Sequence, residues 1–188
     1  MILASGSPQR RAILGQLGIH FRVEVPNIEE LSEGDPREVV VENARRKARE
    51  ISAREISARE RVLGADTAVV LDGRIFGKPD GADEAARFLL ALSARTHEVM
   101  GAIALREPDG SEQSDVAVTR VHMRRIEGTL LDWYLATGEW AERAGGYAIQ
   151  GKGAALVEGI DGDYTNVVGL PVAAMLRLAP DLLPRASA

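Results

Sequence analysis

The chain of 188 residues contains no cysteine. Disulfides and thiolate-ligated metal sites are therefore excluded, and this composition fits a reducing compartment. The chain also lacks an apolar run as long as a membrane-spanning helix, and Met1-Ile2-Leu3-Ala4 has neither the charged start nor the long apolar core of a signal peptide. We therefore expect a cytoplasmic protein that does not enter membranes.

A surplus of positive charge is missing as well. The formal net charge is -5 at pH 7, with 23 Lys and Arg against 28 Asp and Glu. Such a chain has no excess of cations to neutralise a long run of phosphates, so binding to long nucleic acid is not expected. A local basic pocket for a small polyanion is compatible with this balance.

No stretch rich in Pro, Ser or charge divides the chain into separate parts. Apolar runs with strand character alternate with amphipathic segments, and several hairpin signals lie among them, which favours an α/β fold with a mixed sheet. A chain of 188 residues can bury one substantial core or form two small lobes that share one. We predict a single domain over residues 1–188, with two lobes around a cleft.

An aspartate inside an apolar strand is the strongest functional signal. Residues 62–71 have the character of a buried strand, yet Asp66 interrupts them with no turn-forming residue beside it. A buried carboxylate is costly unless it has a cation, a metal or hydrogen-bond donors as partners. The pair Asp72-Gly73 then predicts a type I′ hairpin that returns Lys78 towards Asp66. On residue type alone, a structural ion pair is the simpler explanation of these two charges.

A second signal lies at the first predicted helix. A short apolar strand at residues 1–4 leads through Ser5-Gly6-Ser7-Pro8 into a helix for which Ser7 suits the N-cap. Free backbone N–H groups and the helix dipole make such a terminus an anion site. Arg10 and Arg11 add positive charge to this first turn, which the dipole disfavours unless an anion binds there. A capped helix with solvated arginines is the alternative.

Two further polar side chains have two explanations each. Lys47 lies beside the apolar stripe of a predicted helix, and a lysine at such an edge usually extends into solvent. Gln150 lies in the glycine-rich stretch 145–153, which is explained either by tight turns or by a backbone that approaches a ligand closely. A side-chain amide donates and accepts hydrogen bonds at once, as reading the edge of a base requires.

Two long strands are predicted in the second half of the chain, and each holds an isolated histidine, His97 or His122. Neither has a second ligand at metal spacing, so both are predicted to be half-buried strand residues. In the second of these strands the alternation of apolar residues changes phase, which predicts a β-bulge near Thr119 or Arg120.

Four separated segments carry a combined signal. They are Leu3-Ala4-Ser5-Gly6-Ser7-Pro8-Gln9-Arg10-Arg11, Glu42-Asn43-Ala44-Arg45-Arg46-Lys47-Ala48, Gly64-Ala65-Asp66-Thr67 running to Lys78-Pro79, and Gly145-Gly146-Tyr147-Ala148-Ile149-Gln150-Gly151 running to Val168-Gly169-Leu170-Pro171. Together they resemble the Maf family of nucleoside triphosphate pyrophosphatases, also described as septum formation inhibitors. The segments occur in the family's order and span nearly the whole chain.

The resemblance implies hydrolysis of a nucleoside triphosphate to the monophosphate and pyrophosphate, assisted by a divalent metal, Mg²⁺ or Mn²⁺. It implies that Asp66 binds the metal and is the base that activates water, with Glu30 as a weaker candidate ligand. The residues that it implies for holding the triphosphate are Ser5, Arg10, Lys47 and Lys78. It further implies a mixed, strongly twisted sheet with flanking helices, similar to the inosine triphosphatase fold, and a homodimer.

Three positions bear on the base of the nucleotide. Thr67 and Gln150 resemble the branch of the family that hydrolyses dTTP and UTP, whereas the branch that acts on 7-methyl-GTP tends to have glutamine and glutamate there. Gln9 departs from both branches, which often have arginine or tryptophan, and so keeps 7-methyl-GTP as an alternative. We expect a dTTP and UTP pyrophosphatase, with modified pyrimidine nucleotides as further targets and a link to division arrest. A nucleotide-binding regulator without turnover is the other alternative.

Overall fold

One mixed sheet forms the centre of the computed structural model, which describes residues 1–54 and 59–184. Its seven strands have the order β2-β1-β3-β5-β6-β7, with β4 paired to β3 outside this path. They are β1 (Ile2–Ala4), β2 (Arg22–Glu24), β3 (Val62–Leu71), β4 (Arg74–Phe76), β5 (Thr96–Arg106), β6 (Glu112–Met123) and β7 (Val157–Asp161). β1 runs parallel to β2 and β3, whereas the other pairings are antiparallel. The predicted mixed sheet is confirmed.

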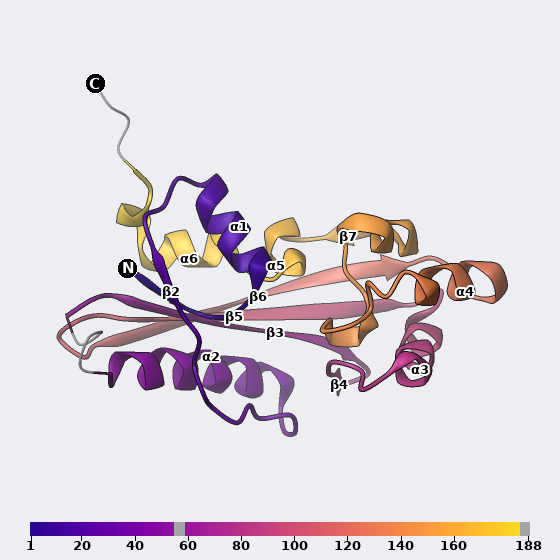
Figure 1. Cartoon of the computed structure of the whole chain (residues 1–188), viewed down its shortest axis with the longest axis horizontal. Helices are drawn as coiled ribbons and strands as arrows, with labels where there is room; N and C mark the ends of the chain where they lie inside the picture. Colours follow the sequence, from indigo (N-terminus) through magenta and orange to yellow (C-terminus); the bar gives the residue numbers. More distant parts are fainter. Residues whose placement is uncertain (55–58, 185–188) are drawn as a thin grey trace.

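Helices cover both faces of this sheet (Figure 1). On one face lie α1 (Pro8–Gln16), α5 (Tyr164–Val168) and α6 (Val172–Leu178), and on the other lies the long α2 (Pro36–Ser52). At one end of the long strands, beside β4, stand α3 (Ala82–Leu92) and α4 (Gly128–Ala136). Short 3-10 helices follow at η2 (Ala144–Gly146), η3 (Gly151–Leu156) and η4 (Pro180–Leu182). Across the described residues, we find no helix with the length and apolar character needed to span a bilayer.

The alternation of side chains along β3 assigns each residue to one of these faces. Leu63 and Ala65 belong to the core under α1 and α6. Val62, Ala68 and Val70 belong to the core under α2. Since side chains two apart share a face, the residue at position 66 projects towards α2 and the residue at position 67 towards α1 and α5. The two faces of one strand thus deliver different polar side chains.

One edge of β3 is interrupted. β1 pairs with Val62–Gly64 and β4 with Val69–Leu71, while β5 occupies the opposite edge from Val62 to Val70. On the side of β1 and β4, no described strand pairs with residues 65–68. This gap separates a lobe that contains β1, β2, α1 and α2 from a lobe that contains β4, α3 and α4. Both lobes are built on the long strands β3, β5 and β6.

The hairpin predicted at Asp72-Gly73 joins β3 to β4. Both turn residues have positive φ, 51° and 75°, as a type I′ turn requires. Arg95 holds the turn from outside, because its Nη2 contacts the two carboxylate oxygens of Asp72 at 2.9 and 2.8 Å. The hairpin prediction is confirmed.

The bulge predicted near Thr119 or Arg120 is wrong. β5 and β6 pair without interruption there, and the irregularity lies between His122 and Met123, against β7. The apolar pattern changes phase because the apolar residues change face: Val116 packs against the core under α2, whereas Val121 and Met123 belong to another core cluster. Thr119 shares the face of Val121, is fully buried, and its Oγ1 accepts a hydrogen bond from Asn166 Nδ2 at 3.0 Å. A polar residue thus fills a core position of the strand.

Helix α2 lies so close to β3 that position 64 has no room for a side chain. A Cβ built on Gly64 would stand 2.1 Å from the carbonyl oxygen of Ala44 and 3.0 Å from the backbone nitrogen of Ala48. Both neighbours are backbone atoms of the helix, so they cannot rotate away. The close approach brings the next polar residue of the strand on this face, Asp66, against α2.

We expect Gly64→Ala to displace α2 and to lower the free energy of unfolding by about 3 kcal/mol, because the added methyl group meets backbone. Gly15→Ala is the matched control, since a Cβ there has nothing within 4 Å and the helix gains a better helix former. Urea unfolding of both variants measures the difference. Equal stabilities would contradict the close packing of α2 on β3.

Candidate active site

A cleft of about 1150 Å³ opens where the edge of β3 is interrupted. Its walls come from the turn after β1, α1, α2, β3, the turn after β4 and the segment 139–151. Every residue to which the family resemblance assigned a role in substrate handling lines it: Ser5, Gln9, Arg10, Lys47, Asp66, Thr67, Lys78 and Gln150. Arg11 does not line it and is exposed. A concave site of this size accommodates a ligand of nucleotide dimensions.

Asp66 is buried at the floor of this cleft, with an exposed fraction of 7%. Its Oδ1 accepts a hydrogen bond from Lys47 Nζ at 2.7 Å, and its Oδ2 accepts one from Asn43 Nδ2 at 3.1 Å. Asn43 and Lys47 lie one helical turn apart on α2 and so present their polar groups to the same strand. The expectation that this carboxylate has a cation and a donor as partners is confirmed.

Lys47 is the centre of the charge cluster. Besides Asp66, its Nζ contacts Glu30 Oε1 at 2.8 Å and the carbonyl oxygen of Ala65 at 3.4 Å. The expectation that this lysine is solvated is wrong, since its side chain is only 7% exposed. Because α2 packs directly on β3 at Gly64, a position beside the apolar stripe is turned into the sheet and not into water.

The carboxylates of Asp66 and Glu30 converge on the same ammonium. Burial acts to raise the pKa of Glu30, but the charge and hydrogen bond of Lys47, together with the charges of Lys78 and Arg10, outweigh it and hold that pKa below its ordinary value. Oxygen ligands of this kind suit hard divalent cations. Within residues 1–54 and 59–184, no cluster of three or more His, Cys, Asp or Glu could enclose a metal. The two carboxylates of Asp66 and Glu30 fit a cation that takes its other ligands from water and phosphate, as Mg²⁺ commonly does.

Arg10 joins the elements on the other side of β3. Its Nη1 donates to Ser5 Oγ at 3.0 Å and to the carbonyl oxygen of Ala65 at 2.9 Å. Its Nε donates to the carbonyl oxygen of Gly169 at 2.9 Å, and its Nη2 donates to Thr67 Oγ1 at 3.2 Å. Burial lowers the pKa of Arg10, and nearby carboxylates oppose that effect. All four acceptors are neutral, so the charge of the guanidinium is balanced through space, by the carboxylates of Asp66 and Glu30.

The hydroxyl groups around Arg10 are ordered by the same contacts. Ser7 caps α1 as predicted, accepting the N–H of Arg10 at 3.4 Å, and its Oγ also donates to Gln9 Oε1 at 3.1 Å. Ser5 Oγ accepts the N–H of Ser7 at 3.2 Å. Thr67 Oγ1 donates to the carbonyl oxygen of Gly169 at 3.3 Å. Two of the predicted specificity residues, Gln9 and Thr67, are therefore held in place before any ligand binds.

Lys78 does not meet Asp66, contrary to the expectation from the hairpin. Its Nζ pairs with Glu142 Oε2 at 2.8 Å, and its side chain is 63% exposed. The reason is the length of β4, which ends at Phe76 opposite Val69 and stops short of the level of Asp66. Lys78 lines the cleft from the opposite lobe, as does the exposed Gln150.

A buried histidine supports the glycine-rich segment from behind. His97 is 2% exposed, so it is buried and not half-buried as predicted. Its Nε2 lies 2.7 Å from the hydroxyl oxygen of Tyr147, which lines the cleft just before Gln150. Burial lowers the pKa of His97 to about 4 and raises that of Tyr147, so both groups are neutral at physiological pH. The pair ties the segment to β5.

Sequence reasoning assigned no role to Asn43. Its Oδ1 accepts the N–H of Leu31 at 2.8 Å and its Nδ2 donates to the carbonyl oxygen of Leu31 at 3.0 Å. One amide thus orients Asp66 and fixes the loop that carries Glu30. The available signal was its spacing, four residues before Lys47, which places both on one helix face.

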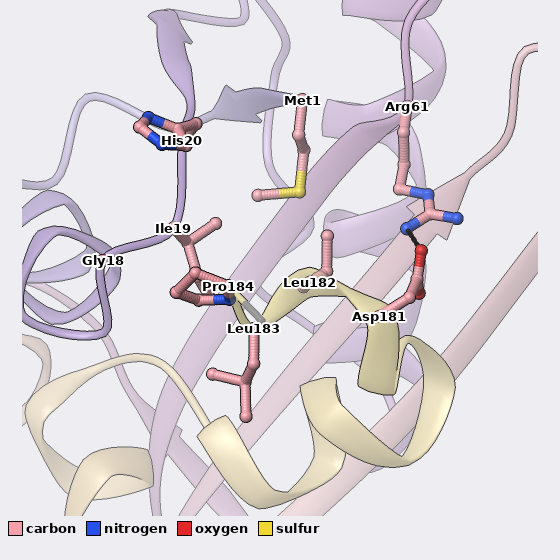
Figure 2. A pocket seen from close by; sticks show the side chains of 9 residues that line it. All are labelled: Met1, Gly18, Ile19, His20, Arg61, Asp181, Leu182, Leu183 and Pro184. Carbon is pink, nitrogen blue, oxygen red and sulfur yellow. Dashed lines mark hydrogen bonds and ion pairs between the residues drawn. The ribbon is translucent and has the colours of Figure 1, made fainter. Parts of the chain in front are cut away.

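A second hollow, of about 450 Å³, lies between the start of β1 and η4 (Figure 2). Apolar side chains, among them Met1, Ile19 and Leu182, form much of its lining. Its arginine, Arg61, is paired with Asp181 at 2.9 Å. None of the predicted site residues lines it, so the chemistry of the chain is concentrated in the larger cleft.

Comparison with known proteins gives a consistent result. The family model described as "Maf-like protein" matches residues 1–182. A protein of Anaeromyxobacter dehalogenans named "dTTP/UTP pyrophosphatase" is 44% identical, with 98% of this chain and 96% of that protein covered. One of the same name from Thermococcus onnurineus is 45% identical, with 95% of each covered. A solved dITP/XTP pyrophosphatase from Mycobacterium abscessus aligns at a TM-score of 0.48 and 20% identity, covering 97% of both chains.

The buried His97 predicts a pH dependence of stability. Its pKa in the folded chain is about 4, whereas an unfolded histidine titrates near about 6.5. As the pH falls, the unfolded chain takes up the proton at a higher pH than the folded chain. The stability that comes from keeping His97 neutral is therefore complete above roughly pH 6.5 and is lost as the pH falls towards the pKa of the folded chain. We expect a loss of about 2 kcal/mol in the free energy of unfolding between roughly pH 7 and pH 5 from this group.

Urea unfolding at a series of pH values measures this loss, and His97→Gln isolates it from the titration of carboxylates. The variant should have the shallower slope over that interval. Identical slopes for the variant and the unaltered protein would show that His97 is accessible to protons in the folded chain.

Proposed function

The chain belongs to the family of Maf-like proteins, and we propose that it hydrolyses dTTP and UTP to the monophosphate and pyrophosphate. Relatives that align along almost the whole chain are named for that activity. The observation that carries the proposal is the buried Asp66, paired with Lys47 in a cleft that Arg10 and Lys78 also line. We propose one domain for residues 1–188, of which 1–182 match the family model.

We infer that Asp66 is the general base. A water molecule would attack the α-phosphorus while its proton passes to the carboxylate of Asp66. The bond between the α-phosphorus and the oxygen that bridges to the β-phosphorus then breaks, and pyrophosphate leaves with the bonding electrons. Each carboxylate oxygen has a second lone pair beyond the hydrogen bonds to Lys47 and Asn43. Those bonds fix the carboxylate for proton transfer.

The positively charged side chains around Asp66 would stabilise the negative charge that develops on the phosphates. Ser5, Arg10 and Lys47 would contact the triphosphate from one lobe and Lys78 from the other, after its exposed pair with Glu142 opens. Fixed cations in a partly buried cleft stabilise such charge more strongly than they would in water. A divalent metal, proposed to be Mg²⁺ or Mn²⁺, supplies further charge neutralisation when bound, and Asp66 and Glu30 would hold it.

We further propose that the base lies between the two lobes. Thr67 and Gln9 are fixed on the lobe of α1, and Gln150 projects from the glycine-rich segment on the opposite side of the cleft. The free amide of Gln150 can donate and accept towards the edge of a pyrimidine. Thr67 would present to the base its methyl group and the remaining lone pair of its Oγ1, which also accepts a hydrogen bond from Arg10.

A panel of nucleoside triphosphates tests the substrate. We expect pyrophosphate and the monophosphate to form fastest from dTTP and UTP with Mg²⁺ or Mn²⁺, and turnover to stop when EDTA removes the metal, because the metal neutralises charge that develops on the phosphates. Stronger turnover of 7-methyl-GTP would keep the mechanism and refute the base assignment. Tight binding without turnover under every metal would favour a nucleotide-dependent regulator.

Asp66→Asn tests the proposed base. We expect kcat to fall by about 10²- to 10⁴-fold, because an amide cannot accept the proton of water. Asp72→Asn is the matched control: it makes the same change at the exposed turn that follows the same strand, where asparagine tolerates the positive φ of 51°. Circular dichroism confirms folding of both variants. Unimpaired turnover by folded Asp66→Asn would exclude this residue as the base.

A further inference from the structure

The carboxylate of Glu139 holds the chain immediately after Gln150. Its Oε2 accepts the backbone N–H of Lys152 at 2.8 Å and that of Gly153 at 3.3 Å. Intervening Gly151 lies against the same carboxylate, since a Cβ built there would stand 2.9 Å from Oε2. Hydrogen bonds from backbone N–H groups to an ionised carboxylate are stronger than those between neutral groups. Glu139 therefore fixes the backbone at the start of η3.

Glu139 is itself positioned by the end of α4. Its backbone N–H donates to Thr137 Oγ1 at 3.0 Å, and Thr137 Oγ1 donates to the carbonyl oxygen of Tyr134 at 2.6 Å. Trp140 Nε1 donates to the carbonyl oxygen of Leu135 at 3.0 Å, which holds the next residue to the same helix. The carboxylate is thus attached to a regular element of the fold.

Gln150 lies between two anchors. On its N-terminal side, Tyr147 is held to β5 by His97, and on its C-terminal side Lys152 and Gly153 are held by Glu139. The side chain of Gln150 is exposed and has no hydrogen bond of its own among the described residues. Its position in the cleft is set by the backbone on either side of it.

We propose that Glu139 is a positioning residue for base recognition: it acts through Lys152 and Gly153 to place the amide of Gln150 at the base. This inference rests on the proposed function, because it assumes that Gln150 faces the base of a nucleotide. Glu139 lines the same cleft, but its Oε2 is directed to the backbone N–H groups, so its effect reaches the ligand through Gln150.

Removal of the carboxylate should impair binding of the preferred base and leave the chemical step intact. We expect Glu139→Ala to raise the KM for UTP about tenfold, with kcat within about twofold of the unaltered protein, because a displaced amide weakens binding without moving the reacting groups. The ratio of kcat/KM for UTP to that for GTP should fall by a similar factor. Glu139→Gln retains an acceptor oxygen and should recover most of the ratio.

Two controls separate this role from a merely structural one. Glu158→Ala removes an exposed glutamate from β7, away from the cleft, and should leave the ratio unchanged. In a chain that already has Gln150→Ala, the additional Glu139→Ala should change the ratio by less than about twofold, because residues that act as a unit are not additive. If Glu139→Ala lowered the ratio of kcat/KM for UTP to that for GTP equally in the unaltered chain and in the Gln150→Ala chain, the positioning role would be refuted.

The same comparison distinguishes the two proposals from each other. If the unaltered protein hydrolyses UTP and Glu139→Ala keeps its preference for UTP over GTP, the positioning role is wrong and the proposed function stands. If the unaltered protein hydrolyses no nucleotide, the proposed function is wrong. Dissociation constants for UTP and GTP, measured by calorimetry on the same variants, then decide the role of Glu139 on binding alone.

Discussion

The interrupted edge of β3 is the constraint on which the site depends. Between the residues paired with β1 and those paired with β4, the strand pairs with another described strand on one side only. A buried carbonyl group must find another partner when a strand is missing. The carbonyl oxygen of Ala65 accepts hydrogen bonds from Arg10 at 2.9 Å and from Lys47 at 3.4 Å. The gap in the sheet therefore gathers two cations at one point of the cleft.

The resulting cluster of buried charges lowers the free energy of unfolding. Lys47, Asp66 and Arg10 are all buried, and taking charges out of water costs more than a single ion pair commonly returns. Arg10 and Lys47 satisfy the carbonyl oxygen of Ala65, whereas apolar residues fill much of the face under α2. In a chain with a net charge of -5, these cations line the cleft to which the proposed function assigns the triphosphate. The cost in stability is consistent with a role in function.

The residues proposed to hold the triphosphate and the proposed base reader Gln150 rest on different supports. The residues around Asp66 depend on α2 and on the first turn of α1, whereas Gln150 depends on α4 and β5 through Glu139 and His97. The two sets meet only across the cleft. Under the proposed function, a change in the glycine-rich segment would alter the preferred base and leave the groups around the triphosphate in place.

The sequence by itself determined the strand that contains Asp66, its type I′ hairpin, the N-cap at Ser7 and the family, because each depends on neighbours in the chain or on a shared motif order. Only the tertiary structure decided which lysine meets Asp66. That outcome depends on the close approach of α2 at Gly64 and on the point where β4 ends. Periodicity describes which side chains share a face of one element, but the distance between two elements is set by how their backbones pack.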